Sequence, residues 1–143
     1  MTDIGSHALV IGGSLTAAAA VAHLACIALG PPAYRLMGAG ERMARAVEAG
    51  KLRPTLVTAA IAAVLLVWAL YAFSGAGVMG PLPLTGWALP AISLVFLARA
   101  LAFPLLRPVF LGNSATFWWV SSGICLLIGL LYAVGAVAAW VAP

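Results

Sequence analysis

Charge is what this sequence has least of. Of its 143 residues, only 7% are Asp, Glu, Lys or Arg, whereas 65% are hydrophobic. A soluble domain of this length carries about 25% charged residues, because polar groups must cover its surface. The low charge therefore excludes an ordinary soluble domain and predicts a membrane protein built as a single domain.

Acidic residues are especially scarce. Asp3, Glu41 and Glu48 are the only ones, and none lies inside a long apolar segment. This argues against a proton-coupled carrier that uses an acid within the membrane, and against catalysis by paired carboxylates. The two cysteines, Cys26 and Cys125, are too few for a disulfide framework.

Ligands for metals and cofactors are also few. His7 and His23 are sixteen residues apart in one apolar segment, which is about 24 Å along a helix, so they cannot hold one haem iron within a chain. No group of Cys and His has the spacing of a zinc site. The sequence therefore predicts no metal and no cofactor. We also expect no nucleic-acid partner, because the basic residues flank apolar segments and leave no basic helix free to enter a groove.

Long apolar segments are what the sequence does contain. Four of them span residues 7–30, 55–77, 84–103 and 115–141. Each reaches the ~20 residues that an α-helix needs to cross a hydrocarbon core of ~30 Å. The alternation of polar and apolar residues expected of membrane β-strands is missing. We predict an all-α, integral membrane four-helix bundle that forms one domain over residues 1–143.

The basic residues predict the orientation. Five of the seven lie between the first two apolar segments: Arg35, Arg42, Arg45, Lys51 and Arg53. The other two, Arg99 and Arg107, lie at the end of the third segment and just after it. Because basic loops stay in the cytoplasm, residues 31–54 are predicted to be cytoplasmic and both termini to lie outside.

The connection at residues 31–54 contains the sequence GERMARAVEAG, which is typical of a short helix. Glu41 and Arg45 are four residues apart, and Arg45 and Glu48 are three apart, so these pairs can meet on one helix face. Met43 and Val47 lie on another face. The segment fits a short interfacial helix on the membrane surface or an ordinary solvated connector, and both interpretations stay open.

Arg99 lies within the apolar stretch FLARALAFPLLRP. It follows Thr85 by fourteen residues, which places it roughly 21 Å along a helix. In one interpretation its side chain extends to lipid phosphates at the membrane surface. In the other it belongs to a buried polar site and needs partners, as ionisable groups in membranes usually do.

Polar residues predicted at the same depth favour the second interpretation. They come from the three other apolar segments and from the connection. We expect them to form, with Arg99, a cationic pocket that opens inward and suits a phosphate, a carboxylate or a lipid headgroup. The predicted ligand-binding residues are Arg99, His23, Ser122, Thr58, Glu41 and Glu48.

Small residues at four-residue spacing mark two segments. They are Ser14, Ala18, Ala22, Cys26 and Gly30 in the first segment, and Ser121, Cys125, Gly129 and Ala133 in the last. Such faces let helix backbones approach closely in lipid. They predict tight packing within the chain, or against a second copy or another subunit of a larger membrane complex.

Two adjacent stretches carry a resemblance. LVTAAIAAVLLVWALYAFSGAG followed by PLPLTGWALPAISLVFLARAL resembles segments of small, uncharacterised four-helix inner-membrane proteins of bacteria, and the general form is similar to DoxX-like proteins. The resemblance implies a bacterial inner (plasma) membrane location and brings no catalytic motif. The size is also similar to membrane-associated glutathione and eicosanoid enzymes, but RMARAVEAG lacks the Asn of their loop pattern.

Three functions are compatible with these observations. The first is a binding or accessory protein that recognises an anionic lipid or a small anion near the inner leaflet, with membrane lipids as partners. The second is a small membrane enzyme acting on a lipophilic substrate beneath the cytoplasmic connection. The third is a structural subunit of a larger membrane complex.

Overall fold

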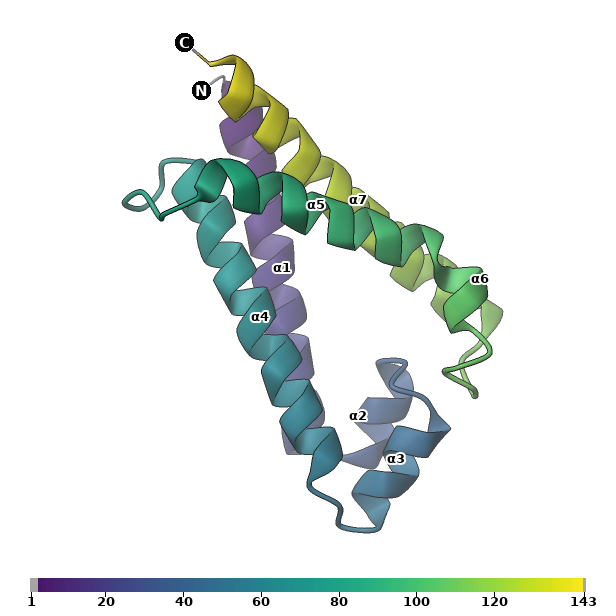
Figure 1. Ribbon diagram of the computed structural model, residues 1–143. Helices are drawn as coiled ribbons and strands as arrows, with labels where there is room; N and C mark the ends of the chain where they lie inside the picture. The colour runs from purple at the N-terminus through teal and green to yellow at the C-terminus, as the bar shows by residue number, and fades with distance from the viewer. Residues whose placement is uncertain (1–2, 143) are drawn as a thin grey trace.

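The computed structural model describes residues 3–142, and within them all regular secondary structure is helical (Figure 1). The helices are α1 (Asp3–Leu29), α2 (Pro31–Leu36), α3 (Glu41–Glu48), α4 (Arg53–Gly75), α5 (Thr85–Leu101), α6 (Phe103–Leu106) and α7 (Ala115–Val141). Three of them, α1, α4 and α7, are 27, 23 and 27 residues long and apolar enough to cross a membrane. The all-α prediction is confirmed, and these helices indicate a membrane protein.

The fourth predicted membrane helix, over residues 84–103, is shorter than expected. Helix α5 has 17 residues, about 26 Å at 1.5 Å per residue, which falls below the thickness of a typical hydrocarbon core. The chain leaves α5 at Ala102 and starts α6 at Phe103. Pro104 explains this break, because its ring clashes with the carbonyl of Ala100 one turn earlier and its nitrogen has no hydrogen to donate.

The long helices form two hairpins, α1 with α4 and α5 with α7, which are joined where α1 packs against α7. In Figure 1 the hairpins meet at the end where the two termini lie and diverge toward the end that holds α2, α3 and α6. The chain therefore has the four predicted helical segments, but they form two splayed hairpins instead of a uniform bundle.

Glycines make the close contacts between these helices. A Cβ atom on Gly13 of α1 would lie 2.9 Å from the Ala72 Cβ of α4, and one on Gly135 of α7 would overlap the Leu9 side chain of α1. Backbones without side chains can approach closely, and this packing stabilises helix pairs in lipid. Between α1 and α7 the hydroxyl of Tyr132 lies 3.2 Å from the Thr16 Oγ1 and 3.0 Å from the carbonyl oxygen of Trp68 in α4, so it ties three helices together.

The small-residue faces pack only in part as predicted. On α7, Gly129 lies against Leu97 of α5, where an added Cβ would be 2.8 Å from the leucine side chain. On α1, however, Ser14 and Ala18 are exposed, and the packed positions are Gly12 and Gly13. Cys26 of the same ladder is buried against α2 and α3. Ser14 and Ala18 therefore do not pack within the chain, and their packing against a second copy or another subunit stays a prediction.

The predicted short helix in the connection is confirmed as α3. Helix α2, which begins at Pro31 directly after α1 ends, was not predicted. Prolines suit the first turn of a helix, so Pro31 and Pro32 start α2 as well as ending α1. The buried side chains of Cys26, Tyr34 and Ala44 hold α1, α2 and α3 together.

The connection also joins the two hairpins at their diverging end. The Glu41 backbone N–H donates to the Leu111 carbonyl at 3.1 Å, and the Asn113 Nδ2 donates to the Gly38 carbonyl at 3.1 Å. Gly38 has a φ of +78° and lies so close beneath the Phe117 ring that a Cβ atom would overlap it. A residue without a side chain is therefore needed at this crossing.

Candidate functional site

Arg99 lies in the last turn of α5 and points its charge at the first turns of α7. Its Nη2 donates a hydrogen bond to the Ser121 Oγ at 2.7 Å. Its Cζ lies 5.4 Å from the centroid of the Trp118 ring, within the range of a cation–π interaction. The guanidinium is thus held on two sides by one helix and does not simply extend into solvent.

Three hydrogen-bonding groups, one on Arg99 and two in the first turns of α7, are buried without a partner among residues 3–142. They are the Arg99 Nη1, the Trp118 Nε1 and the Ser122 Oγ. Trp118 and Ser122 are only 2% and 7% exposed, and their four-residue spacing places them on one face of α7. An unsatisfied buried donor costs about 1–3 kcal/mol, so three of them together point to a missing acceptor.

The arrangement suits an anion. The guanidinium and the indole N–H can only donate hydrogen bonds, and a serine hydroxyl can donate as well. A phosphate or carboxylate oxygen only accepts, and it also brings the negative charge that Arg99 lacks. Arginine binds such groups strongly because its planar fork offers two parallel donors.

The structure places the other predicted ligand residues differently. Ser122 lies on the helix that Arg99 contacts, but the direct partner of Arg99 is its neighbour Ser121. His23 bonds through Nδ1 to the Ala19 carbonyl of its own helix at 2.7 Å, which requires the hydrogen to be on Nδ1. Thr58 is buried in α4, with 6% of its surface exposed. Among residues 3–142, the Arg99 side chain bonds to Ser121 and to neither His23 nor Thr58.

Glu41 and Glu48 are paired within the connection. Arg35 donates from Nε to Glu41 at 3.0 Å and from Nη2 to Glu48 at 2.8 Å, while the Arg45 Nε donates to Glu41 at 3.2 Å. The predicted Glu41–Arg45 pair is therefore present. These hydrogen bonds lower the pKa of Glu41 to about 2, and the same carboxylates raise the pKa of Arg35.

The ion pairs of Glu41 and Glu48 within the connection determine the net charge around Arg99. Both carboxylates that were expected to cap Arg99 are engaged by Arg35 and Arg45. Over the part of the chain that the structure describes, Arg99 has no carboxylate partner. Its positive charge is thus left uncompensated, as a site for an external anion requires.

Sequence reasoning missed the roles of Trp118, Ser121 and Arg35. Trp118 and Ser121 lie three residues apart, a spacing that puts them on one face of a helix, but nothing in the sequence indicated which face meets Arg99. Arg35 reaches Glu48 across thirteen residues because α2 and α3 fold back on each other. No local spacing rule predicts such a pair.

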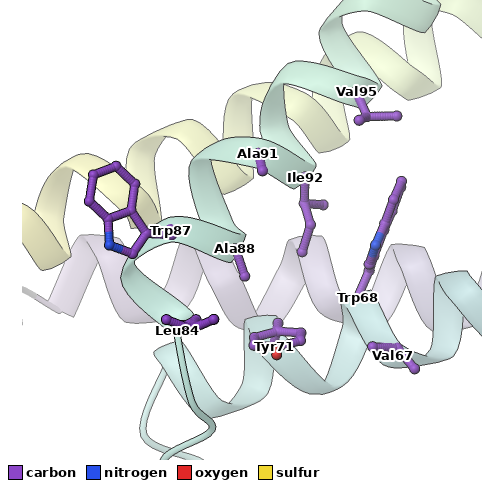
Figure 2. A pocket seen from close by; sticks show the side chains of 9 residues that line it. All are labelled: Val67, Trp68, Tyr71, Leu84, Trp87, Ala88, Ala91, Ile92 and Val95. Carbon is purple, nitrogen blue, oxygen red and sulfur yellow. The ribbon is translucent and has the colours of Figure 1, made fainter.

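An apolar groove lies elsewhere, between α4 and α5 (Figure 2). It encloses about 380 Å³ and has Trp68 and Tyr71 of α4 and Trp87 of α5 among its lining residues. The lining contains no charged side chain, so this groove does not suit an anion. Among residues 3–142, no group of three or more His, Cys, Asp or Glu residues could hold a metal ion.

Comparisons with known proteins give no match to a family model, to a curated protein or to a solved structure. The function is therefore inferred from the chemistry around Arg99.

Proposed function

We propose that this protein is an integral membrane binding or accessory protein that recognises an anionic lipid or a small anion near the inner leaflet. The observation that carries the proposal is the buried, unpartnered Nη1 of Arg99, whose guanidinium lies over the Trp118 ring, together with the unpartnered Trp118 Nε1 and Ser122 Oγ on the same helix. These groups offer donors and a positive charge where no acceptor from the described residues is present.

The contacts of Arg99 support binding because they hold the guanidinium before a ligand arrives. The Ser121 hydroxyl accepts from Nη2, and the Trp118 ring packs beneath the guanidinium. A side chain that is already ordered loses less conformational entropy when it binds, which favours affinity. A freely extended arginine would need neither contact.

The position of Arg99 supports a ligand at the membrane surface. Arg99 lies two residues before the end of α5 at Leu101, so its charge is close to one end of the apolar helices. The basic connections predict that this end faces the cytoplasm. We further propose, on the resemblance and on this charge pattern, a bacterial inner-membrane location with both termini outside.

Lipid retention measured by native mass spectrometry tests the proposal. We expect wild-type protein released from mixed micelles to keep phosphatidylglycerol in preference to phosphatidylcholine, and Arg99→Leu to lose the part of this preference that Arg99 contributes. Arg99→Lys should retain little of it, because lysine offers a point charge without paired donors. Arg107→Leu is the matched control, since Arg107 is exposed and its replacement removes the same charge near the same membrane surface.

Titration of lipid-free protein with inorganic phosphate distinguishes a small anion from a lipid. Binding of phosphate that Arg99→Leu abolishes would identify a small-anion site. Equal lipid retention and equal phosphate binding in wild type, Arg99→Lys and Arg99→Leu would show that Arg99 is a structural anchor and would refute the proposal. Chemical conversion of the bound lipid would instead favour the alternative function, a small membrane enzyme that acts on a lipophilic substrate.

A further inference from the structure

A second cavity lies at the diverging end of the hairpins, apart from Arg99. It is a groove of about 780 Å³ between the start of α3 and the segment that connects α6 to α7. One wall carries Arg42 and Arg45, and the other carries Pro108, Val109 and Leu111. Its volume is within the range of ~300–1,000 Å³ that is usual for small-molecule sites.

The α3 wall is positively charged. Arg42 and Arg45 are three residues apart, so their side chains lie on neighbouring positions of one helix face. Arg42 has no ion-pair partner over residues 3–142, and Arg45 uses only its Nε for Glu41. Glu41 also lines the groove, but its charge is shared with Arg35. Two guanidiniums are therefore left with free donors for an anion.

The opposite wall is apolar and exposed. Val109 and Leu111 have 69% and 68% of their surface accessible, and Leu105 on the adjoining α6 has 78%. Exposed large apolar side chains beside arginines, at the end of apolar membrane helices, match the boundary between lipid headgroups and acyl chains. A free phosphate ion would use the arginines but would gain nothing from this wall.

Hydrogen bonds hold the two walls in place. The Glu41 N–H donates to the Leu111 carbonyl, and the Asn113 amide donates to the Gly38 carbonyl. Gly40 and Gly112 have φ values of +89° and +95°, which other residues rarely adopt, and they form the turns where the walls approach each other. The groove is thus formed before a ligand binds.

We propose that this groove binds the phosphate headgroup of an anionic phospholipid. Arg42 and Arg45 contact the phosphate, and Val109 and Leu111 contact the glycerol and upper acyl region. This site is separate from the one at Arg99 and does not depend on it. It would make the connection a lipid-binding element at the membrane surface.

The experiment measures phosphatidylglycerol affinity of the full chain by native mass spectrometry. A hydrogen bond to a charged group is worth about a tenfold factor in affinity, so Arg42→Gln should weaken binding about tenfold. The Arg42→Gln/Arg45→Gln double variant should lose one bound lipid. Arg53→Gln is the matched control, because Arg53 is exposed, its replacement removes the same charge and it does not line the groove. Arg42 makes no ion pair with the described residues, so Arg42→Gln keeps the test valid if the double variant unfolds.

Two further measurements distinguish the phosphate of a phospholipid from free inorganic phosphate. The Val109→Ser/Leu111→Ser variant should weaken phosphatidylglycerol binding without changing the charge. Millimolar inorganic phosphate should not displace the lipid. Complete displacement by phosphate, or equal lipid affinity in wild type, Arg42→Gln and the Arg53→Gln control, would overturn the proposal. Loss of binding in Arg99→Leu alone would support the Arg99 site and refute this one.

Discussion

The indole Nε1 of Trp140 donates a hydrogen bond to the Gly86 carbonyl at 3.0 Å. In a regular helix this carbonyl accepts from the backbone nitrogen four residues later, but that residue is Pro90, which has no hydrogen to donate. Trp140 of α7 thus supplies the hydrogen bond that Pro90 removes from α5. The contact also joins the two helices of one hairpin near the ends of the chain.

This relationship predicts a coupling between the two positions. Trp140→Phe should lower the free energy of unfolding in detergent by about 1–3 kcal/mol, because a carbonyl in a membrane helix is left without a donor. In the Pro90→Ala background the loss should be smaller, since an alanine at this position restores the backbone N–H. Trp119→Phe serves as the control for loss of an exposed indole. Equal losses in both backgrounds would show that the hydrogen bond has no such role.

The contact of Gly135 with Leu9 gives a packing prediction. A Cβ atom at position 135 would overlap the Leu9 side chain, whereas one at Gly123 on the same helix would meet nothing within 4 Å. Gly135→Ala should therefore destabilise the fold by about 1–3 kcal/mol, and Gly123→Ala should be neutral or stabilising. Thermal unfolding in detergent measures both. Rescue of Gly135→Ala by Leu9→Ala would identify the α1–α7 contact as the cause, and no rescue would contradict it.

The ion-pair cluster of the connection predicts a dependence on pH. The folded pKa of Glu41 is lowered from 4.5 to about 2, chiefly by the hydrogen bond from Arg35. A lowered carboxylate pKa means that the cluster stabilises the folded state fully above pH 4.5 and loses this effect as the pH falls toward 2. The melting temperature of Arg35→Gln should therefore lie below that of wild type at neutral pH, and the difference should shrink between pH 4.5 and 2. A difference that is constant with pH would exclude this cluster as its source.

Topology can be tested by labelling cysteines with an impermeant thiol reagent. Cysteine at Gly80, which is exposed, should react from the outside, and cysteine at Lys51, which is also exposed, should react only after the membrane is opened. The reason is the concentration of basic residues around Lys51 and their absence around Gly80. The opposite labelling pattern would reverse the orientation. The predicted outer position of the termini includes Met1, Thr2 and Pro143, which lie outside the described residues.

The sequence by itself predicted the features that depend on local chemistry. Apolar segments of sufficient length became α1, α4 and α7, because a helix in lipid satisfies its own backbone hydrogen bonds. The Glu41–Arg45 pair followed from a four-residue spacing. The end of α5 at Leu101, before Pro104, has an equally local cause, although the predicted segment ran to residue 103.

Only the tertiary structure decided which sides of these helices meet. On α1, Gly12 and Gly13 pack against neighbouring helices, whereas Ser14 and Ala18 do not. Arg99 pairs with Ser121. Glu41 and Glu48 both pair with Arg35. The physical reason is that membrane helices are apolar on all sides, so hydrophobicity does not mark a buried face. Close packing and hydrogen bonds between distant segments then set the rotation of each helix. The buried donors of Arg99, Trp118 and Ser122 are a product of that packing.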